Sequence, residues 1–129
     1  EGDSAPYLIY SYARARSILR KAAEQGITPA AAGDSSLALL SSEDEYAVAK
    51  QISDLPDAVR KAAASNEPFM IARQTSQIAR SFNRFYNNTY ILSGAADEVT
   101  GARLALCEAV CTALKTGCNL LGFDVVERM

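Results

Sequence analysis

The segment from Asp97 to Met129, DEVTGARLALCEAVCTALKTGCNLLGFDVVERM, decides the fold that we expect for this chain. Apolar and small residues recur in it at steps of three and four, which places them on one face of a helix over 98–121. This stripe consists of Leu106, Val110, Ala113, Gly117 and Leu120. Asp97 suits an N-cap and Gly122 suits a left-handed C-cap. The segment therefore predicts a long helix that packs at the centre of a helical domain.

After this helix the chain continues through Phe123-Asp124-Val125-Val126 to the charged residues Glu127-Arg128-Met129. An apolar segment this near a chain end is expected either to pack on the domain or to bind a partner, because free ends otherwise fray. We expect Phe123 and Val125 to fold this tail back beside the first helix and the segment 84–86. Deleting Arg128 and Met129 is then expected to harm recognition more than folding.

Length and composition indicate one globular domain. The chain has 129 residues, of which 49% are apolar and 22% charged, values that are ordinary for a soluble domain with a core. No apolar run has the length of a membrane-spanning helix. The chain starts with neither Met nor a signal peptide, so we expect residues 1–129 to be a single domain cut from a larger protein.

Boundary residues predict four further helices and hence an all-α bundle of about five helices. The first runs from about Pro6 to Gln25, the second follows a Ser42–Glu45 capping box, the third starts at Leu55-Pro56-Asp57, and the fourth lies between Asn66-Glu67-Pro68 and Asn87-Asn88. We expect a loop or loosely helical connector over 26–40, and a crossing segment over 89–96.

Helical periodicity also predicts which residues face inward. The expected core residues are Leu8, Tyr12, Ala15, Leu19 and Ala22 in the first helix, Tyr46, Ala49 and Ile52 in the second, Val59 and Ala62 or Ala63 in the third, and Ile71, Thr75, Ile78, Phe82 and Phe85 in the fourth.

The residues that usually carry catalysis are missing from the sequence. There is no histidine, and neither a GxGxxG nor a GxxxxGK[ST] motif. Cys107, Cys111 and Cys118 all lie in the last helix, where small buried thiols are the simplest interpretation; a metal site at Cys107 and Cys111 would need further ligands. We therefore predict no catalytic, cofactor or metal site in this chain, and a reducing, cytoplasmic compartment.

Basic residues are arranged in stripes although the net charge is −2. The stripes consist of Tyr10, Arg14, Ser17 and Lys21 in the first helix, and of Arg73, Gln77, Arg80 and Arg84 in the fourth. The segment 24–57 between them is acidic. A near-neutral total can thus conceal a basic face suited to a phosphate backbone.

Three segments, in order, resemble arginyl-tRNA synthetases. The segments are PYLIYSYAR at 6–14 with SILRKA at 17–22, then Glu67-Pro68 with Ile78-Ala79 and FNRFY at 82–86, then ARLAL at 102–106 with Gly117, LLG at 120–122 and ERM at 127–129. Ile9, Ala15 and Val126 depart from the family pattern, which has Gln, a larger aliphatic residue and Pro there. No RNA contact is carried over to Ile9.

The resemblance implies the C-terminal, anticodon-binding helical domain (DALR type) of a class I synthetase, a ligase that joins arginine to tRNA-Arg. ATP and magnesium would bind to a catalytic domain elsewhere in the same chain. The implied partner is the tRNA-Arg anticodon loop, with no DNA and no membrane, and the implied state is a cytoplasmic monomer.

The residues predicted to bind tRNA are Tyr10, Arg14, Arg80, Asn83, Arg84, Tyr86, Arg128 and Met129. Aromatic rings stack on unpaired bases, arginines bind phosphates, and an amide pairs with a base edge. Arg84→Ala is expected to weaken tRNA binding and its salt dependence. Alternatives stay open, because both tyrosines also suit half-buried positions and Asn83 also suits a brace between helices.

A second hypothesis is a protein-interaction module that docks a partner through its last helix and tail. It predicts an exposed apolar stripe near Leu120 to Val126, and it fails if those side chains are buried. The DALR domain of another synthetase is a third possibility, which Glu127-Arg128-Met129 disfavours.

Overall fold

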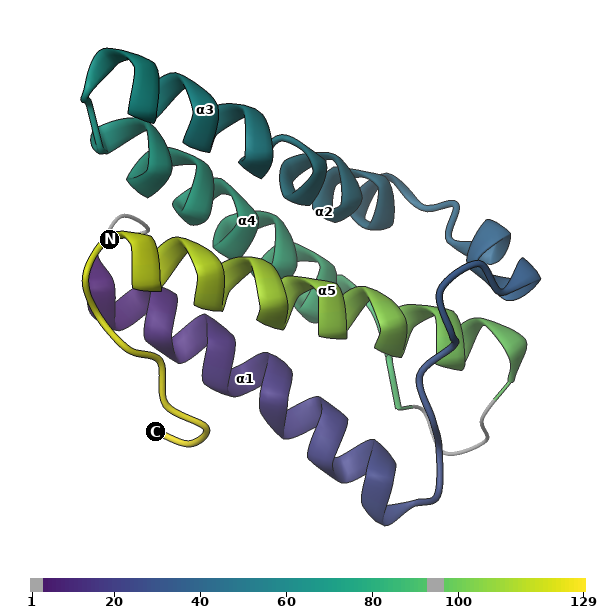
Figure 1. Cartoon of the computed structure of the whole chain (residues 1–129). Helices are drawn as coiled ribbons and strands as arrows, with labels where there is room; N and C mark the ends of the chain where they lie inside the picture. Colours follow the sequence, from purple (N-terminus) through teal and green to yellow (C-terminus); the bar gives the residue numbers. More distant parts are fainter. Residues whose placement is uncertain (1–3, 93–96) are drawn as a thin grey trace.

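Helices account for all the regular secondary structure in the described residues, 4–92 and 97–129, of the computed structural model (Figure 1). The elements are α1 (Ala5–Glu24), the 3-10 helix η1 (Ser35–Leu39), α2 (Glu43–Ser53), α3 (Leu55–Ser65), α4 (Phe69–Asn88) and α5 (Glu98–Leu120). The predicted all-α bundle is therefore confirmed. Of the predicted crossing segment 89–96, residues 93–96 lie outside the described residues.

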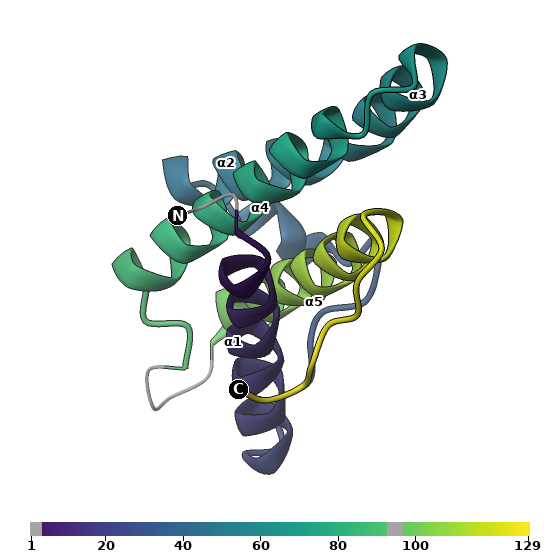
Figure 2. The ribbon, with the colours of Figure 1, turned by 90° about the vertical axis from the view of Figure 1, so that its left-hand side faces the viewer.

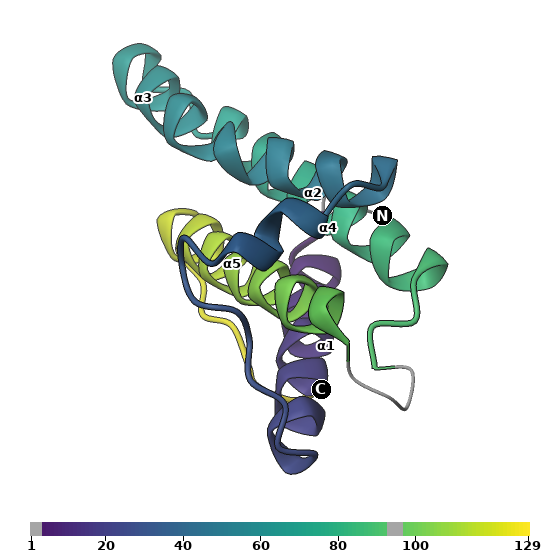
Figure 3. The ribbon, with the colours of Figure 1, turned by 90° about the vertical axis from the view of Figure 1, so that its right-hand side faces the viewer.

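The helices are arranged around α5. It packs against α1 on one side and against α4 and α2 on another, while the connector with η1 also contacts it (Figures 1 and 3). Helices α2 and α3 follow each other end to end along α4 (Figure 1). The α3 end of this layer projects away from α1 and α5 (Figures 2 and 3). None of the described helices is both long enough and apolar enough to cross a membrane.

The stripe of α5 is buried as predicted except at its last position. Leu106, Val110, Ala113 and Gly117 are buried, whereas Leu120 is 50% exposed, so that part of the prediction is wrong. The chain turns at Gly122, which has a φ of +97°, and the Phe123 N–H donates to the carbonyl of Cys118 (3.1 Å). Phe123, instead of Leu120, therefore continues the buried surface.

Helices α4 and α5 are in close contact at Gly117. A Cβ at this position would overlap the side chain of Thr75, which is itself buried. The Thr75 hydroxyl donates to the carbonyl of Ile71 (2.7 Å), which fixes its rotamer. The absence of a side chain at Gly117 is therefore what allows the two helices to pack here.

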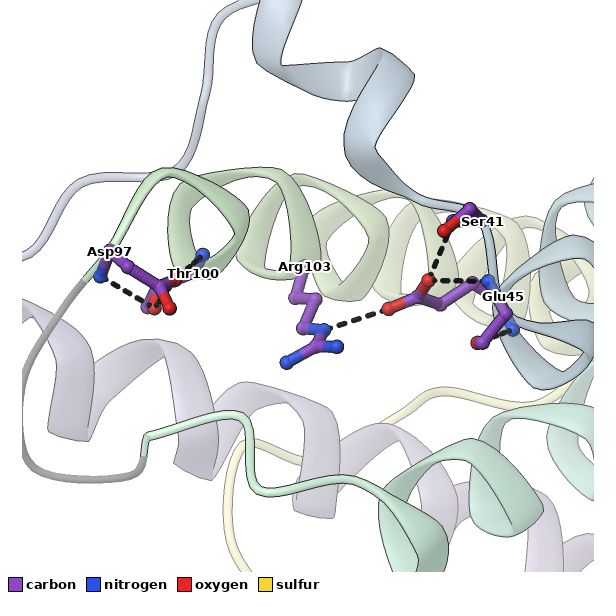
Figure 4. Close-up of polar contacts among 6 residues, drawn as sticks. Ser41, Glu45, Asp97, Thr100 and Arg103 are labelled. Atoms are coloured by element: carbon purple, nitrogen blue, oxygen red, sulfur yellow. Dashed lines mark hydrogen bonds and ion pairs between the residues drawn. The ribbon is translucent and has the colours of Figure 1, made fainter.

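The inward face of α2 differs from the prediction. Tyr46 and Ala49 are exposed, and Glu45 and Val48 are buried instead, with Ile52 partly buried. The reason is an ion pair, since the Nε of Arg103 in α5 lies 2.7 Å from Oε2 of Glu45 (Figure 4). A carboxylate that is paired in this way can occupy a core position that the apolar pattern assigns to another residue.

Glu45 also completes the predicted capping box. Its Oε1 accepts the N–H groups of Ser41 (2.9 Å) and Ser42 (3.0 Å), and the Ser42 hydroxyl accepts the N–H of Glu45 (3.0 Å) (Figure 4). Burial by itself raises the pKa of Glu45, but the hydrogen bond from Ser42 and the pairing with Arg103 outweigh it and lower the pKa overall. One carboxylate thus both begins α2 and joins it to α5.

Most of the remaining core predictions hold, although Val59 of α3 is only partly buried. The residues predicted to face inward in α4 are all buried, Leu19 of α1 is half-buried, and Ala62 instead of Ala63 is the buried alanine of α3. The three cysteines are buried in α5, as expected for small apolar residues. Burial raises the pKa of Cys107 to about 12, so this thiol stays protonated at neutral pH.

Candidate nucleic-acid interface

A buried amide joins α4 to α1. The Nδ2 of Asn83 lies 2.8 Å from the Ser11 hydroxyl and 3.0 Å from the Tyr7 hydroxyl, both in α1, and also 3.0 Å from the carbonyl of Ala79. Its Oδ1 accepts a hydrogen bond from Nη1 of Arg14 (2.9 Å). Asn83 therefore braces the two helices, the second of its two predicted roles, and also fixes the side chain of Arg14.

Arg14 is held between two aromatic rings. Its guanidinium carbon lies 4.0 Å from the ring centroid of Tyr86 in α4 and 5.0 Å from that of Tyr10 in α1. Tyr86 in turn packs edge-on against Phe82, with ring centroids 6.2 Å apart. Attraction between cation and ring adds to the hydrogen bond that Arg14 donates to Asn83, so the layer of Tyr10, Arg14 and Tyr86 is pre-organised. Both tyrosines are partly exposed.

The tail after α5 is fastened to α1 by Glu127. Its carboxylate accepts hydrogen bonds from the Tyr12 hydroxyl (3.0 Å) and from Nε of Arg16 (2.9 Å), and its main-chain carbonyl accepts one from Nη1 of Arg20 (3.1 Å). The hydrogen bond from Arg16 holds the pKa of Glu127 below its usual range. Figure 2 shows the tail running along α1. The predicted return of the tail to the first helix is confirmed.

A cleft of about 420 Å³ lies where α1, the end of α4 and the tail meet. It is lined by Tyr10, Ala13, Arg14, Ser17, Ile18, Arg20, Lys21, Tyr86, Arg128 and Met129. Four of these side chains are basic, and no lining side chain is acidic. We call this space the basic cleft. It has aromatic walls and a positive rim, which is the combination that binds unpaired nucleotides.

The predicted site residues divide into two groups. Tyr10, Arg14, Tyr86, Arg128 and Met129 line the basic cleft, and Asn83 lies beneath it. Arg80 and Arg84 do not line it, although both are exposed on α4. Arg84 precedes Tyr86 by two residues, which turns its side chain about 200° around the helix from that ring. The basic stripe of α4 therefore faces a different direction from the cleft.

Two cations of the cleft were absent from the predicted set. Arg20 and Lys21 line it, and Lys21 belongs to the α1 stripe that begins with Tyr10 and Arg14. The periodicity of that stripe was the signal that could have identified Lys21. No pattern in the sequence pointed to Arg20, because its position in the cleft accompanies its hydrogen bond to the main-chain carbonyl of Glu127 in the tail.

The apolar stripe that the protein-interaction hypothesis requires is interrupted. Leu120 and Val126 are 50% and 43% exposed, but Phe123 and Val125 between them pack against the core. Two separated side chains do not form a continuous apolar surface. Phe123, Val125 and the hydrogen-bonded Glu127 thus hold the tail on its own domain.

Comparison with known proteins agrees with this geometry. The family of the DALR anticodon binding domain matches residues 8–129. The chain belongs to this family. The resemblance seen in the three sequence segments is thereby confirmed over nearly the whole chain.

The proteins to which this chain is similar all carry the name of the same enzyme. The chain is similar to arginine–tRNA ligases of Clostridium botulinum (strain Hall), at 42% identity, and of Clostridium perfringens, at 40%, both over 129 residues. It is also similar to the solved structure of Thermus thermophilus arginyl-tRNA synthetase, with a TM-score of 0.83 and 34% identity. In each case all of this chain is matched, and it spans 22% of the relative's length.

Proposed function

We propose that this DALR domain belongs to an arginine–tRNA ligase and recognises the anticodon loop of tRNA-Arg in the basic cleft. The observation that carries the proposal is the layer of Tyr10, Arg14 and Tyr86, which opens into a cleft lined with cations. The relatives, all named arginine–tRNA ligases, support the choice of tRNA. ATP and magnesium would act at a catalytic domain of the same parent chain, and the parent would work as a cytoplasmic monomer.

Each wall of the cleft suits one part of an unpaired nucleotide. The exposed ring of Tyr10 offers a face to a base, and each stacked base contributes about 1–3 kcal/mol. Arg20, Lys21 and Arg128 lie at the rim, where they reach phosphates, which position the loop. Arg14 is already fixed by Asn83, so its remaining N–H donors can contact a base edge without a further cost in side-chain entropy.

A fluorescence anisotropy titration tests the proposal. The chain is titrated against a labelled tRNA-Arg anticodon stem-loop and against the same stem-loop with its middle anticodon base replaced. Specific recognition predicts at least about tenfold tighter binding to the first RNA, equivalent to about 1.4 kcal/mol. Equal affinity for both RNAs would leave only nonspecific attraction to phosphates and would contradict the proposal.

Matched variants locate the site. Lys21→Ala removes a cation of the cleft, whereas Lys61→Ala removes an exposed cation of α3 that is paired with Asp57 (3.2 Å). Only Lys21→Ala should weaken binding and reduce the slope of log K against log salt, by about 0.7 for one phosphate of a single strand. Equal effects of both variants would place the RNA elsewhere.

A further inference from the structure

The sulfur-containing side chains of this protein differ widely in their access to solvent. The sequence has three cysteines and two methionines, all within the described residues. Cys107 and Cys118 are fully buried in α5, and Cys111 is 6% exposed. Met70, at the start of α4, is partly buried. Met129, in contrast, is 74% exposed, so its sulfur is the one that a dissolved oxidant reaches most easily.

The cysteines are protected by chemistry as well as by burial. A thiol reacts with an oxidant as the thiolate. Burial raises the pKa of Cys107 to about 12 and that of Cys118 to about 11. It also raises the pKa of Cys111 to about 11, although the Arg16 cation beside this thiol acts in the opposite direction. At neutral pH about one of these thiols in 10,000 or fewer is ionised. A thioether reacts without losing a proton, so Met129 has no such barrier.

The exposed sulfur belongs to a residue at the basic cleft. The carboxylate of Glu127, two positions earlier, accepts hydrogen bonds from Tyr12 and Arg16 and holds the tail on α1 (Figure 2). Met129 then lines the basic cleft, whereas neither Met70 nor any of the three cysteines does so. The side chain that is most open to oxidation is therefore part of the surface that we assign to RNA.

We propose that Met129 is an oxidation site for hydroperoxides, and that its sulfoxide weakens RNA binding in the basic cleft. A lone pair of the Met129 sulfur forms a bond to the terminal oxygen of the hydroperoxide, and the O–O bond breaks. The proton of the terminal oxygen moves to the departing oxygen, which leaves as an alcohol, or as water where the oxidant is hydrogen peroxide. Sulfur loses two electrons and the hydroperoxide gains them. The effect on RNA rests on the proposed function; the oxidation itself does not.

The sulfoxide changes the cleft in two ways. It replaces an apolar wall by a polar, chiral group. Its oxygen is a hydrogen-bond acceptor close to the cations Arg20, Lys21 and Arg128 of the same cleft, where it competes with RNA phosphates for their N–H donors. Loss of the apolar contact alone corresponds to about fourfold weaker binding, the factor for one buried methyl group.

Peptide mass spectrometry tests the selectivity. The folded chain is treated with dilute hydrogen peroxide, and the gain of one oxygen atom is followed separately at each sulfur. Met129 should react at least about tenfold faster than Met70, which is partly buried and whose sulfur accepts a hydrogen bond from Ser65 (4.0 Å). The cysteines should not react in that time. In urea the rates of the two methionines should converge. Faster oxidation of Met70 or of a cysteine in the folded chain would overturn the inference.

Anisotropy titrations with the anticodon stem-loop test the consequence. The chain oxidised at Met129 should bind about fourfold more weakly or worse, and methionine sulfoxide reductases for both epimers, with a thiol reductant, should restore its affinity. Met70→Leu is the matched control and should lose affinity on oxidation as the parent does. Met129→Leu, whatever its starting affinity, should not change on peroxide treatment, because its cleft contains no sulfur.

The outcomes separate this inference from the proposed function. Unchanged stem-loop binding after complete oxidation of Met129 would overturn the inference alone. An equal loss of affinity in Met129→Leu would do the same, because the sensitive group would then lie elsewhere. Equal binding to the correct and the altered stem-loop before any peroxide is added would instead overturn the proposed function, and with it the consequence for RNA.

Discussion

Arg16 and Glu127 are separated by 111 residues in the chain, and their side chains form an ion pair with Nε and Oε1 2.9 Å apart. The pair connects the middle of α1 to the tail that follows α5. Together with Tyr12 and Arg20 it holds the last residues over the basic cleft. A contact made at the surface of one helix thereby determines where Arg128 and Met129 lie.

Removing the two residues that this anchor positions should affect binding and leave folding unchanged. Deleting Arg128 and Met129 takes away one cation and one apolar wall of the basic cleft, but leaves the anchor of Glu127 in place. We expect weaker stem-loop binding at an unchanged urea midpoint. Truncation places the terminal carboxylate of the shortened chain at Glu127, close to Arg16. The variant Arg128→Ala/Met129→Ala removes the same two side chains without this added charge and is therefore the control. A large drop in the urea midpoint, with normal binding by the folded fraction, would make the tail purely structural.

The tail should detach at low pH. The hydrogen bond from Arg16 lowers the pKa of Glu127, so the ionised carboxylate is the form that binds α1. The contribution of this contact is complete above the ordinary glutamate pKa of about 4.3 and is lost as pH falls through the lower value in the folded protein. An NMR titration of the Glu127 carboxyl carbon and of the Arg16 Nε–H should show one common transition below pH ~4.3. A transition midpoint at or above the ordinary glutamate pKa would contradict the prediction. As a control, the Arg16 signal should show no such transition in the Glu127→Gln variant.

Arg14 should not be replaceable by lysine. The guanidinium is planar, stacks between Tyr10 and Tyr86 and donates to Asn83 at the same time, whereas an ammonium is a compact point charge. Arg14→Lys is expected to weaken stem-loop binding about tenfold, equivalent to about 1.4 kcal/mol. Arg84→Lys, which also keeps its charge but lies outside the cleft, should have little effect. Similar losses in both variants would argue against the layered arrangement.

The buried pair of Glu45 and Arg103 should be important for stability. Glu45→Ala leaves Arg103 without its partner and also removes the carboxylate half of the capping box of α2, so we expect a loss of about 3–5 kcal/mol in the free energy of unfolding by urea. Asp54→Asn breaks the exposed pair with Lys50 and should change stability little. A loss for Glu45→Ala as small as that for Asp54→Asn would show that the buried pair is not needed.

Gly117→Ala should destabilise the bundle by about 1–3 kcal/mol, because the new methyl group overlaps the Thr75 side chain. Gly101→Ala is the matched control, since the nearest atom to its new Cβ would be 3.5 Å away, and replacing glycine inside a helix is otherwise favourable. The double variant Thr75→Ala/Gly117→Ala should lose less than the sum of the single losses. Strict additivity would show that the overlap is not the cause.

The sequence by itself determined the helices and most of their buried faces. The capping box of Ser42 and Glu45 and the start of α5 at Asp97 form as predicted, because a cap needs only residues within one turn of one another. The apolar stripe of α4 is buried throughout for a related reason, since periodicity within one helix states which side chains share a face. Interactions within one helix were therefore sufficient to predict these features.

Only the tertiary structure decided which faces meet. The burial of Glu45 depends on Arg103, a residue of another helix, and the basic cleft brings together Tyr10, Tyr86 and Arg128 from three distant segments. Tyr86 faces α1 whereas Arg84 faces away, and this follows from how α4 packs against its neighbours. A helical stripe specifies a surface, but the partner of that surface is selected by side chains on both helices and by the angle at which they cross.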